Sequence, residues 1–132
     1  MYYVQLVDDE PIIRNGLSKM IDWESLGFEI ACLAQNGKQA LEQLEIEKVD
    51  LIITDIEMPV MDGLTFISEV REMENSLEPK EIIVITAYDD FEYAKTAIRY
   101  GVAGYMLKPV DSDELAKVIL QVKANLDQKR GL

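Results

Sequence analysis

The stretch Leu51-Ile52-Ile53-Thr54, which runs directly into Asp55, decides the fold. It is apolar without the alternation of a half-buried strand, and this pattern favours a strand covered on both faces, as in a parallel sheet. Four more apolar runs of strand length occur at residues 3–7, 28–34, 82–86 and 104–107. Because amphipathic segments separate these runs, the sequence predicts strands that alternate with helices.

The amphipathic segments carry helix signals. Pro11 suits the first position of a helix whose apolar stripe would be Ile13, Leu17, Met20 and Ile21. The other positions expected to begin or end helices are Asn36, Asp62, Asp89 with Glu92, Asp111 with Glu114, and Gly101. A helix would follow each strand, which predicts a doubly wound (βα)5 parallel sheet with helices on both faces.

Length and composition fit one domain with one core. The chain has 132 residues, of which 48% are hydrophobic, enough for a folded globular unit. We expect the domain to span residues 1–128, with residues 129–132 beginning a linker. No apolar run approaches the ~20 residues that cross a bilayer, and the N-terminus lacks a signal-peptide pattern. These features predict a cytoplasmic domain without membrane contact.

The charge balance and the missing residue types exclude several functions. The formal net charge of −12 should repel a phosphate backbone, so we expect no nucleic-acid binding by this domain itself. The absence of histidine excludes histidine triads and histidine zinc sites. The single cysteine, Cys32, excludes an internal disulfide, and its apolar neighbours favour a buried structural thiol. Any chemistry must come from carboxylates, lysine, hydroxyl groups and the backbone.

Polar residues follow the predicted strands where each strand ends. They are Asp8, Asp9 and Glu10, then Asp55, then Thr86, then Lys108. The carboxyl ends of parallel strands share one edge, where ligands bind. Each residue alone has an ordinary interpretation, such as a helix cap or a turn. Together, crowded carboxylates require a cation, and oxygen ligands suit Mg²⁺. With Lys108 and Thr86 beside them, the sequence predicts a pocket for a phosphoryl group.

These strand ends resemble a known family, the receiver domains of two-component response regulators. The matching motifs are Val7-Asp8-Asp9-Glu10-Pro11, Thr54-Asp55-Ile56-Glu57-Met58-Pro59-Val60-Met61-Asp62-Gly63, Thr86-Ala87 and Gly104-Tyr105-Met106-Leu107-Lys108-Pro109. They occur in the family's order and extend over residues 2–128. The resemblance implies a flavodoxin-like sheet of strand order 2-1-3-4-5. It also implies a signalling switch that catalyses its own phosphorylation and dephosphorylation, and not an enzyme with an external substrate.

The resemblance assigns roles around the metal and the acceptor. Asp55 would be the nucleophile that takes the phosphoryl group from a phosphohistidine of a sensor histidine kinase. The carboxylates of Asp9 and Asp55 and the backbone carbonyl of Glu57 would bind Mg²⁺, and Asp8 would hold a metal-bound water. Glu57 and Tyr88 would flank the route of attacking water and so tune the lifetime of the phosphoryl group.

The resemblance also implies a switch. Lys108 would pair with one phosphoryl oxygen, while the Thr86 hydroxyl and the Ala87 backbone N–H would bind others. Thr86 would move toward the phosphoryl group, and Tyr105 would turn into the space it leaves. The Lys108-Pro109 bond resembles the family's cis peptide.

Two further stretches, residues 21–28 and 88–95, resemble receivers joined to a C-terminal AraC-type helix-turn-helix domain. The implied partners are a sensor kinase and an effector domain on the same chain. Any self-association would increase on phosphorylation.

Two other functions remain open. A stand-alone receiver of the chemotaxis type would act on a protein partner and needs the same residues. An aspartate-nucleophile phosphohydrolase would expect a second Asp two residues after the nucleophile, where this chain has Glu57. A dinucleotide-binding fold is set aside because no G-x-G-x-x-G follows the first run.

Overall fold

A computed structural model describes residues 1–74 and 79–131. Its centre is a five-stranded sheet in the order β2-β1-β3-β4-β5, with every neighbouring pair parallel. The strands are β1 (Tyr2–Val7), β2 (Phe28–Ala34), β3 (Leu51–Thr54), β4 (Glu81–Thr86) and β5 (Gly104–Leu107). The expected fold class and strand order are therefore confirmed, with β1 and β4 each beginning one residue before the predicted run.

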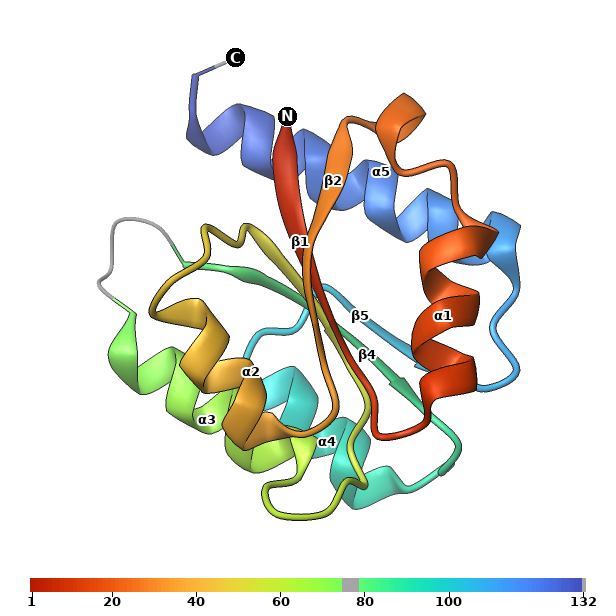
Figure 1. The fold of residues 1–132 in the computed structure, drawn as a ribbon, viewed down its shortest axis with the longest axis vertical. Helices are drawn as coiled ribbons and strands as arrows, with labels where there is room; N and C mark the ends of the chain where they lie inside the picture. Colours follow the sequence, from red (N-terminus) through yellow and green to blue (C-terminus); the bar gives the residue numbers. More distant parts are fainter. Residues whose placement is uncertain (75–78, 132) are drawn as a thin grey trace.

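Helices cover both faces of the sheet (Figure 1). They are α1 (Pro11–Met20), α2 (Gly37–Leu44), α3 (Gly63–Met73), α4 (Phe91–Arg99) and α5 (Ser112–Lys129). Helices α1 and α5 pack on one face, where Leu17 and Ile119 join a core cluster. Helices α2, α3 and α4 pack on the other, where Phe66 and Ala97 join a second cluster. Burial on both faces explains why the central strands β1, β3 and β4 lack polar alternation, whereas the edge strands β2 and β5 are partly exposed.

The register brings the strand ends to one edge. Val7 lies beside both Ala34 and Thr54, and Thr86 lies beside Leu107. The next residues continue the ladder, since the Asp55 N–H donates to the Val7 carbonyl at 2.9 Å and the Lys108 N–H donates to the Thr86 carbonyl at 2.8 Å. We call this the carboxyl edge, and the opposite edge, where the strands begin, the amino edge.

Most predicted helix ends are confirmed. Asn36 and Asp62 cap α2 and α3, and Asp111 caps α5 by accepting from the N–H groups of Asp113 and Glu114. Gly101, with φ 72°, follows the end of α4.

Three expectations were wrong. The cap of α4 is Asp90 and not Asp89, because the helix begins at Phe91. Met20 is 38% exposed and does not belong to the buried stripe. The helix ends at Met20, and the extended backbone of Ile21 turns the Ile21 side chain into the core instead. Cys32 is half-buried and not fully buried, yet burial still raises the pKa of its thiol to about 11.

The connection between α1 and β2 forms part of the core. It contains a 3-10 helix (Glu24–Leu26). Trp23 is 6% exposed, donates its indole N–H to the Leu17 carbonyl at 3.2 Å and packs edge-on against Phe28. Because Phe28 opens β2, Trp23 lies toward the amino edge. No helix within the described residues is long and apolar enough to span a membrane.

Candidate functional site

The ammonium group of Lys108 joins the ends of three strands at the carboxyl edge. Its Nζ lies 3.0 Å from Asp8 Oδ2 and 3.1 Å from Asp55 Oδ2, with Glu10 Oε1 at 3.7 Å. Asp8 follows β1, Asp55 follows β3 and Lys108 follows β5. The peptide bond between Lys108 and Pro109 is cis, as expected. The structure therefore brings together the three residues that sequence reasoning placed at the centre of the pocket.

Both central carboxyl groups are buried. Asp8 is 2% exposed and Asp55 is 6% exposed. Burial raises the pKa of Asp55 above its ordinary value, and the neighbouring Asp8 charge raises it further. Burial likewise raises the pKa of Asp8, against the hydrogen bonds it accepts from Glu10 N–H and Lys108. Ionisation of these two groups therefore opposes folding when no further cation is bound.

The pKa of Lys108 reflects two opposing effects. Burial acts to lower it, but the hydrogen bond to Asp8 and the charges of Asp55 and Asp8 outweigh burial and raise it. Lys108 is thus held as a fixed cation, and its single charge cannot neutralise the carboxylates of Asp8, Asp55 and Glu10 together.

The carboxylates of Asp8, Asp9 and Glu10 could share one cation. One oxygen of each lies within 4.8 Å of the others. Arg14, from the first turns of α1, donates to the backbone carbonyl of Asp8 at 2.5 Å and so fixes the segment. The donors are all oxygen and mostly charged, which fits Mg²⁺ and not a soft metal. Arg14 was not predicted, although its place one turn after the acidic residues was a signal.

Asp55 is held in place by its own loop. Its Oδ1 accepts from the Ile56 N–H at 2.7 Å. The Gly63 N–H donates to the Ile56 carbonyl at 2.6 Å. A Cβ on Gly63 would lie 1.9 Å from the Asp55 carbonyl oxygen, so any larger residue would displace the loop. The glycine allows α3 to begin directly against the strand end.

The segment after β4 provides further polar groups. Thr86 is fully buried, and its Oγ1 accepts from the Tyr88 N–H at 3.1 Å, which leaves its own hydrogen available for donation. Ala87, the next residue, is exposed. Tyr105 is half-buried, and its hydroxyl donates to the Tyr88 carbonyl at 3.3 Å. Burial and the charges of Asp90 and Asp89 raise the Tyr105 pKa.

Two predicted residues lie at the rim and not at the centre. Glu57 is exposed, and its Oε2 accepts from the Tyr93 hydroxyl at 3.3 Å. Tyr88 is 49% exposed. Both line an open groove with Met58, Pro59, Asp62 and Tyr93. Tyr93 was not predicted, because its approach to Glu57 depends on how α4 packs against the loop after β3.

The family model of the response regulator receiver domain matches residues 4–120. The chain belongs to this family. The confirmed strand order and the carboxyl-edge pocket of the receiver domain agree with the resemblance carried by the sequence motifs.

Individual relatives point to transcriptional regulators. The chain is 39% identical over 129 residues to the transcriptional regulatory protein YesN of Bacillus subtilis, a match that covers 98% of this chain and 34% of YesN. The receiver domain of AraT, a response regulator from Geobacillus stearothermophilus, is 41% identical, with a TM-score of 0.85 and 98% of each chain covered. A two-component transcriptional regulator AraC from Clostridium phytofermentans is 27% identical, with a TM-score of 0.86 and 100% of each chain covered. The chain thus spans about a third of the length of YesN.

Proposed function

We propose that this receiver domain accepts a phosphoryl group on Asp55 from a sensor histidine kinase. The observation that carries the proposal is the Asp55 carboxylate, which is buried at the end of β3 and lies 3.1 Å from Lys108. Burying a carboxylate beside one cation and several acidic residues lowers the stability of the fold, so stability does not explain the arrangement. Phosphoryl transfer provides a reason for that cost, because the arrangement serves positioning and charge stabilisation.

Mg²⁺ fits the donor set of the pocket. Asp9 and Asp55 would hold it through their carboxylates, Glu57 through its backbone carbonyl and Asp8 through a water molecule. When bound, the metal would offset the negative charge of the carboxylates and of the phosphoryl oxygens. The support is the unbalanced charge of the pocket, in which one lysine, Lys108, pairs with Asp8, Asp55 and Glu10 in the part of the chain that the structure describes.

The chain's own residues would act in one in-line displacement. A carboxylate oxygen of Asp55 forms the new bond to phosphorus, and the bond from phosphorus to the kinase histidine breaks, with its electron pair returning to the imidazole nitrogen. Lys108 would shift its contact to a phosphoryl oxygen. The Thr86 hydroxyl, whose hydrogen is available, and the Ala87 N–H would donate to the others. Preorganised donors of this kind stabilise the charge that spreads over the phosphoryl group.

Intact mass spectrometry tests the acceptor. Incubation with Mg²⁺ and acetyl phosphate should add one acid-labile phosphoryl group, and EDTA should prevent the addition. Asp55→Asn should remove it, whereas Asp113→Asn, an exposed acid at the start of α5, should leave it unchanged. Uptake by Asp55→Asn at the wild-type rate would overturn the assignment.

The output would follow from the Thr86 and Tyr105 switch. Thr86 would turn toward the phosphoryl group, and Tyr105, whose hydroxyl now bonds to the Tyr88 carbonyl, would turn inward. We infer that the change acts on a DNA-binding effector domain of the same chain, because the curated relatives are transcriptional regulators of greater length. The AraC type follows from the resemblance of residues 21–28 and 88–95 and from the similar AraC regulator. The net charge of −12 argues against DNA binding by the receiver itself. Any self-association should increase on phosphorylation.

The domain boundaries belong to the same proposal. Residues 1–128 would form the receiver in the cytoplasm, and residues 129–132 would begin the linker, although α5 itself continues to Lys129 and residue 132 lies outside the described residues. The linker would leave from the amino edge, since Lys129 and Arg130 still contact Glu81 and Asp50.

A switch, and not a phosphohydrolase, fits the rim of the pocket. A hydrolase of the aspartate class would use a second Asp, two residues after the nucleophile, to protonate the leaving group, and this chain has Glu57 there. Here Glu57 is exposed and hydrogen-bonded to Tyr93. Lasting turnover of a simple phosphate ester would favour the hydrolase. A chemotaxis-type partner protein remains the alternative output, and the length of the native chain decides between the two.

Tyr88 would lengthen the life of the phosphoryl group by covering the route of attacking water. The residue is 49% exposed and lines the groove. Tyr88→Ala should speed dephosphorylation by about two- to fivefold, equivalent to about 0.5–1 kcal/mol of barrier. Release of phosphate after removal of the donor measures this rate, and an unchanged rate would leave Tyr88 without this role.

A further inference from the structure

A cavity of about 170 Å³ lies at the amino edge, at the opposite end of the strands from Asp55. Its lining comes from the residues that precede β3, the residues that precede β4 and the last turn of α5. Four of the lining residues are cations: Lys48, Lys80, Lys129 and Arg130. The concentration is unusual in a chain with 13 Lys+Arg against 25 Asp+Glu. The cavity is a positive site on an acidic protein.

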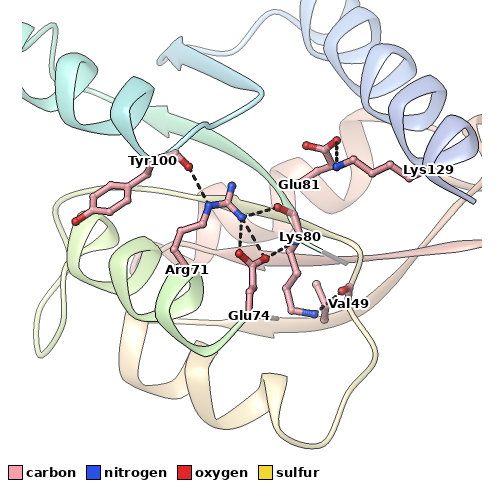
Figure 2. A network of polar contacts seen from close by, with 7 residues as sticks. All are labelled: Val49, Arg71, Glu74, Lys80, Glu81, Tyr100 and Lys129. Carbon is pink, nitrogen blue, oxygen red and sulfur yellow. Dashed lines mark hydrogen bonds and ion pairs between the residues drawn. The ribbon is translucent and has the colours of Figure 1, made fainter. Parts of the chain in front are cut away.

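Two of the four cations are matched by carboxylates. Arg130 pairs with Asp50 at 2.5 Å, and Asp50 is only 5% exposed. Lys129 forms an ion pair with Glu81 at 3.5 Å, and a dashed line marks this pair in Figure 2. Both cations also suit the carboxyl end of a helix, where the backbone carbonyls carry partial negative charge. The structural role of Lys129 and Arg130 is thereby explained.

The other two cations have no such match. Lys80 donates from Nζ to the Val49 carbonyl at 2.8 Å (Figure 2). Lys48 lies over the ring of Tyr3, with Nζ 5.8 Å from the ring centre. Within residues 1–74 and 79–131, no ion pair joins either side chain to a carboxylate. Among the residues that the structure describes, the cavity is therefore lined by four cations and one carboxylate, Asp50.

We propose that this cavity binds a phosphate group, either free or on a compact ester. A lysine ammonium offers three donors and no acceptor, so Lys48 and Lys80 can both turn to one tetrahedral anion. Lys80 would exchange its bond to a neutral carbonyl for a charge-assisted bond. The size of the cavity suits one compact anion. The acidic remainder of the chain would repel the anion at long range and so lower the affinity of the site. Because salt screens charges, the affinity should also depend on salt concentration.

A titration followed by amide NMR tests the proposal. The domain, with EDTA and without phosphodonor, is titrated with inorganic phosphate or with glycerol phosphate at constant ionic strength. The amide signals of Val49, Asp50 and Lys80 should shift and saturate with both ligands. If only the ester saturates, the source is a phosphorylated small molecule, and the site stands. Sodium chloride in place of phosphate provides the control.

Paired variants locate the site. Lys48→Gln with Lys80→Gln should weaken phosphate binding by about tenfold or more. Lys95→Gln with Lys117→Gln, two exposed cations on α4 and α5, should bind as wild type does. Asp55→Asn should also bind normally, which separates this site from the proposed phosphoacceptor. Amide shifts that rise linearly with phosphate and do not saturate would overturn the proposal. Equal phosphate affinities in the two double variants would overturn it as well.

Discussion

The two edges of the sheet carry similar residues in opposite electrostatic arrangements. At the carboxyl edge, Lys108 is the one cation, among the described residues, that pairs with Asp8, Asp55 and Glu10. At the amino edge, Asp50 has its own partner in Arg130, and Glu81 likewise has Lys129. Buried charge is tolerable when each ion is paired, and costly when like charges share one partner. The difference teaches that each of these buried acids at the amino edge has a cation of its own, whereas the acids at the carboxyl edge share one lysine, so a further cation and a phosphoryl group are expected there.

The amino edge also has a wider polar network, drawn in Figure 2. Arg71 of α3 donates to the Tyr100 carbonyl at 2.9 Å, to Glu74 at 2.8 Å and to the Lys80 carbonyl at 2.9 Å. The Lys80 N–H in turn donates to Glu74. One guanidinium group therefore joins the end of α3, the end of α4 and the start of β4. Every contact in this set pairs a donor with an acceptor, as expected of a structural element.

Neutralising an acid at the amino edge should cost the most stability. Asp50→Asn removes the charge that pairs with Arg130, although the amide oxygen can still accept from the Tyr3 N–H. We expect a loss of about 2 kcal/mol in the free energy of unfolding, because a nearly buried charge-assisted hydrogen bond is broken. Urea unfolding in EDTA measures it. An Asp50→Asn domain as stable as wild type would show that the amino edge is not held by matched charges.

The same change at the carboxyl edge should have the opposite sign. Asp8→Asn removes a charge that burial and neighbouring acids make unfavourable, so metal-free stability should rise by about 1 kcal/mol. Because the pKa of Asp8 is raised in the folded domain, the ionised form costs stability above its ordinary titration range. The gain should therefore be present near neutral pH and should shrink as acid protonates Asp8 in the wild type. A loss of stability at neutral pH would make Asp8 a structural cap.

Trp23 should report the smallest effect of all. It packs against Phe28 toward the amino edge, and its indole N–H is bonded to the Leu17 carbonyl. Saturating Mg²⁺ at the carboxyl edge should therefore leave its fluorescence nearly unchanged. Emission spectra with and without Mg²⁺ test this directly. A large quench would mean that the two edges are more closely coupled than their separate contacts indicate.

The sequence predicted the carboxyl edge well for a physical reason. Strands covered on both faces read as apolar runs, and residues directly after them must meet at one edge. Asp55 and Lys108 were therefore placed together without knowledge of the packing. The cap of α4 was misplaced by one residue because Asp89 and Asp90 are equally able to cap, and only the first turn of the helix decides between them.

The amino edge could not be predicted in the same way. Asp50 and Arg130 lie 80 residues apart, and nothing in the local sequence of either indicates the other. Lys48 and Lys80 are ordinary loop residues until tertiary packing brings them to one cavity. Tyr93 reaches Glu57 for the same reason. Contacts made by side chains from separate elements depend on packing angles that periodicity does not contain.

Unfolding with Mg²⁺ and with EDTA tests the contrast between the edges most directly. Three proteins are compared by urea unfolding: wild type, Asp9→Asn and Asp50→Asn. A ligand that binds only the folded state stabilises it by RT ln(1 + [Mg²⁺]/Kd), about 1.4 kcal/mol at ten times Kd. Wild type and Asp50→Asn should gain this amount equally, whereas Asp9→Asn, which lacks a carboxylate at the carboxyl edge, should gain much less. Equal stabilisation of all three proteins, or of none, would contradict the assignment of the carboxyl edge as the cation site.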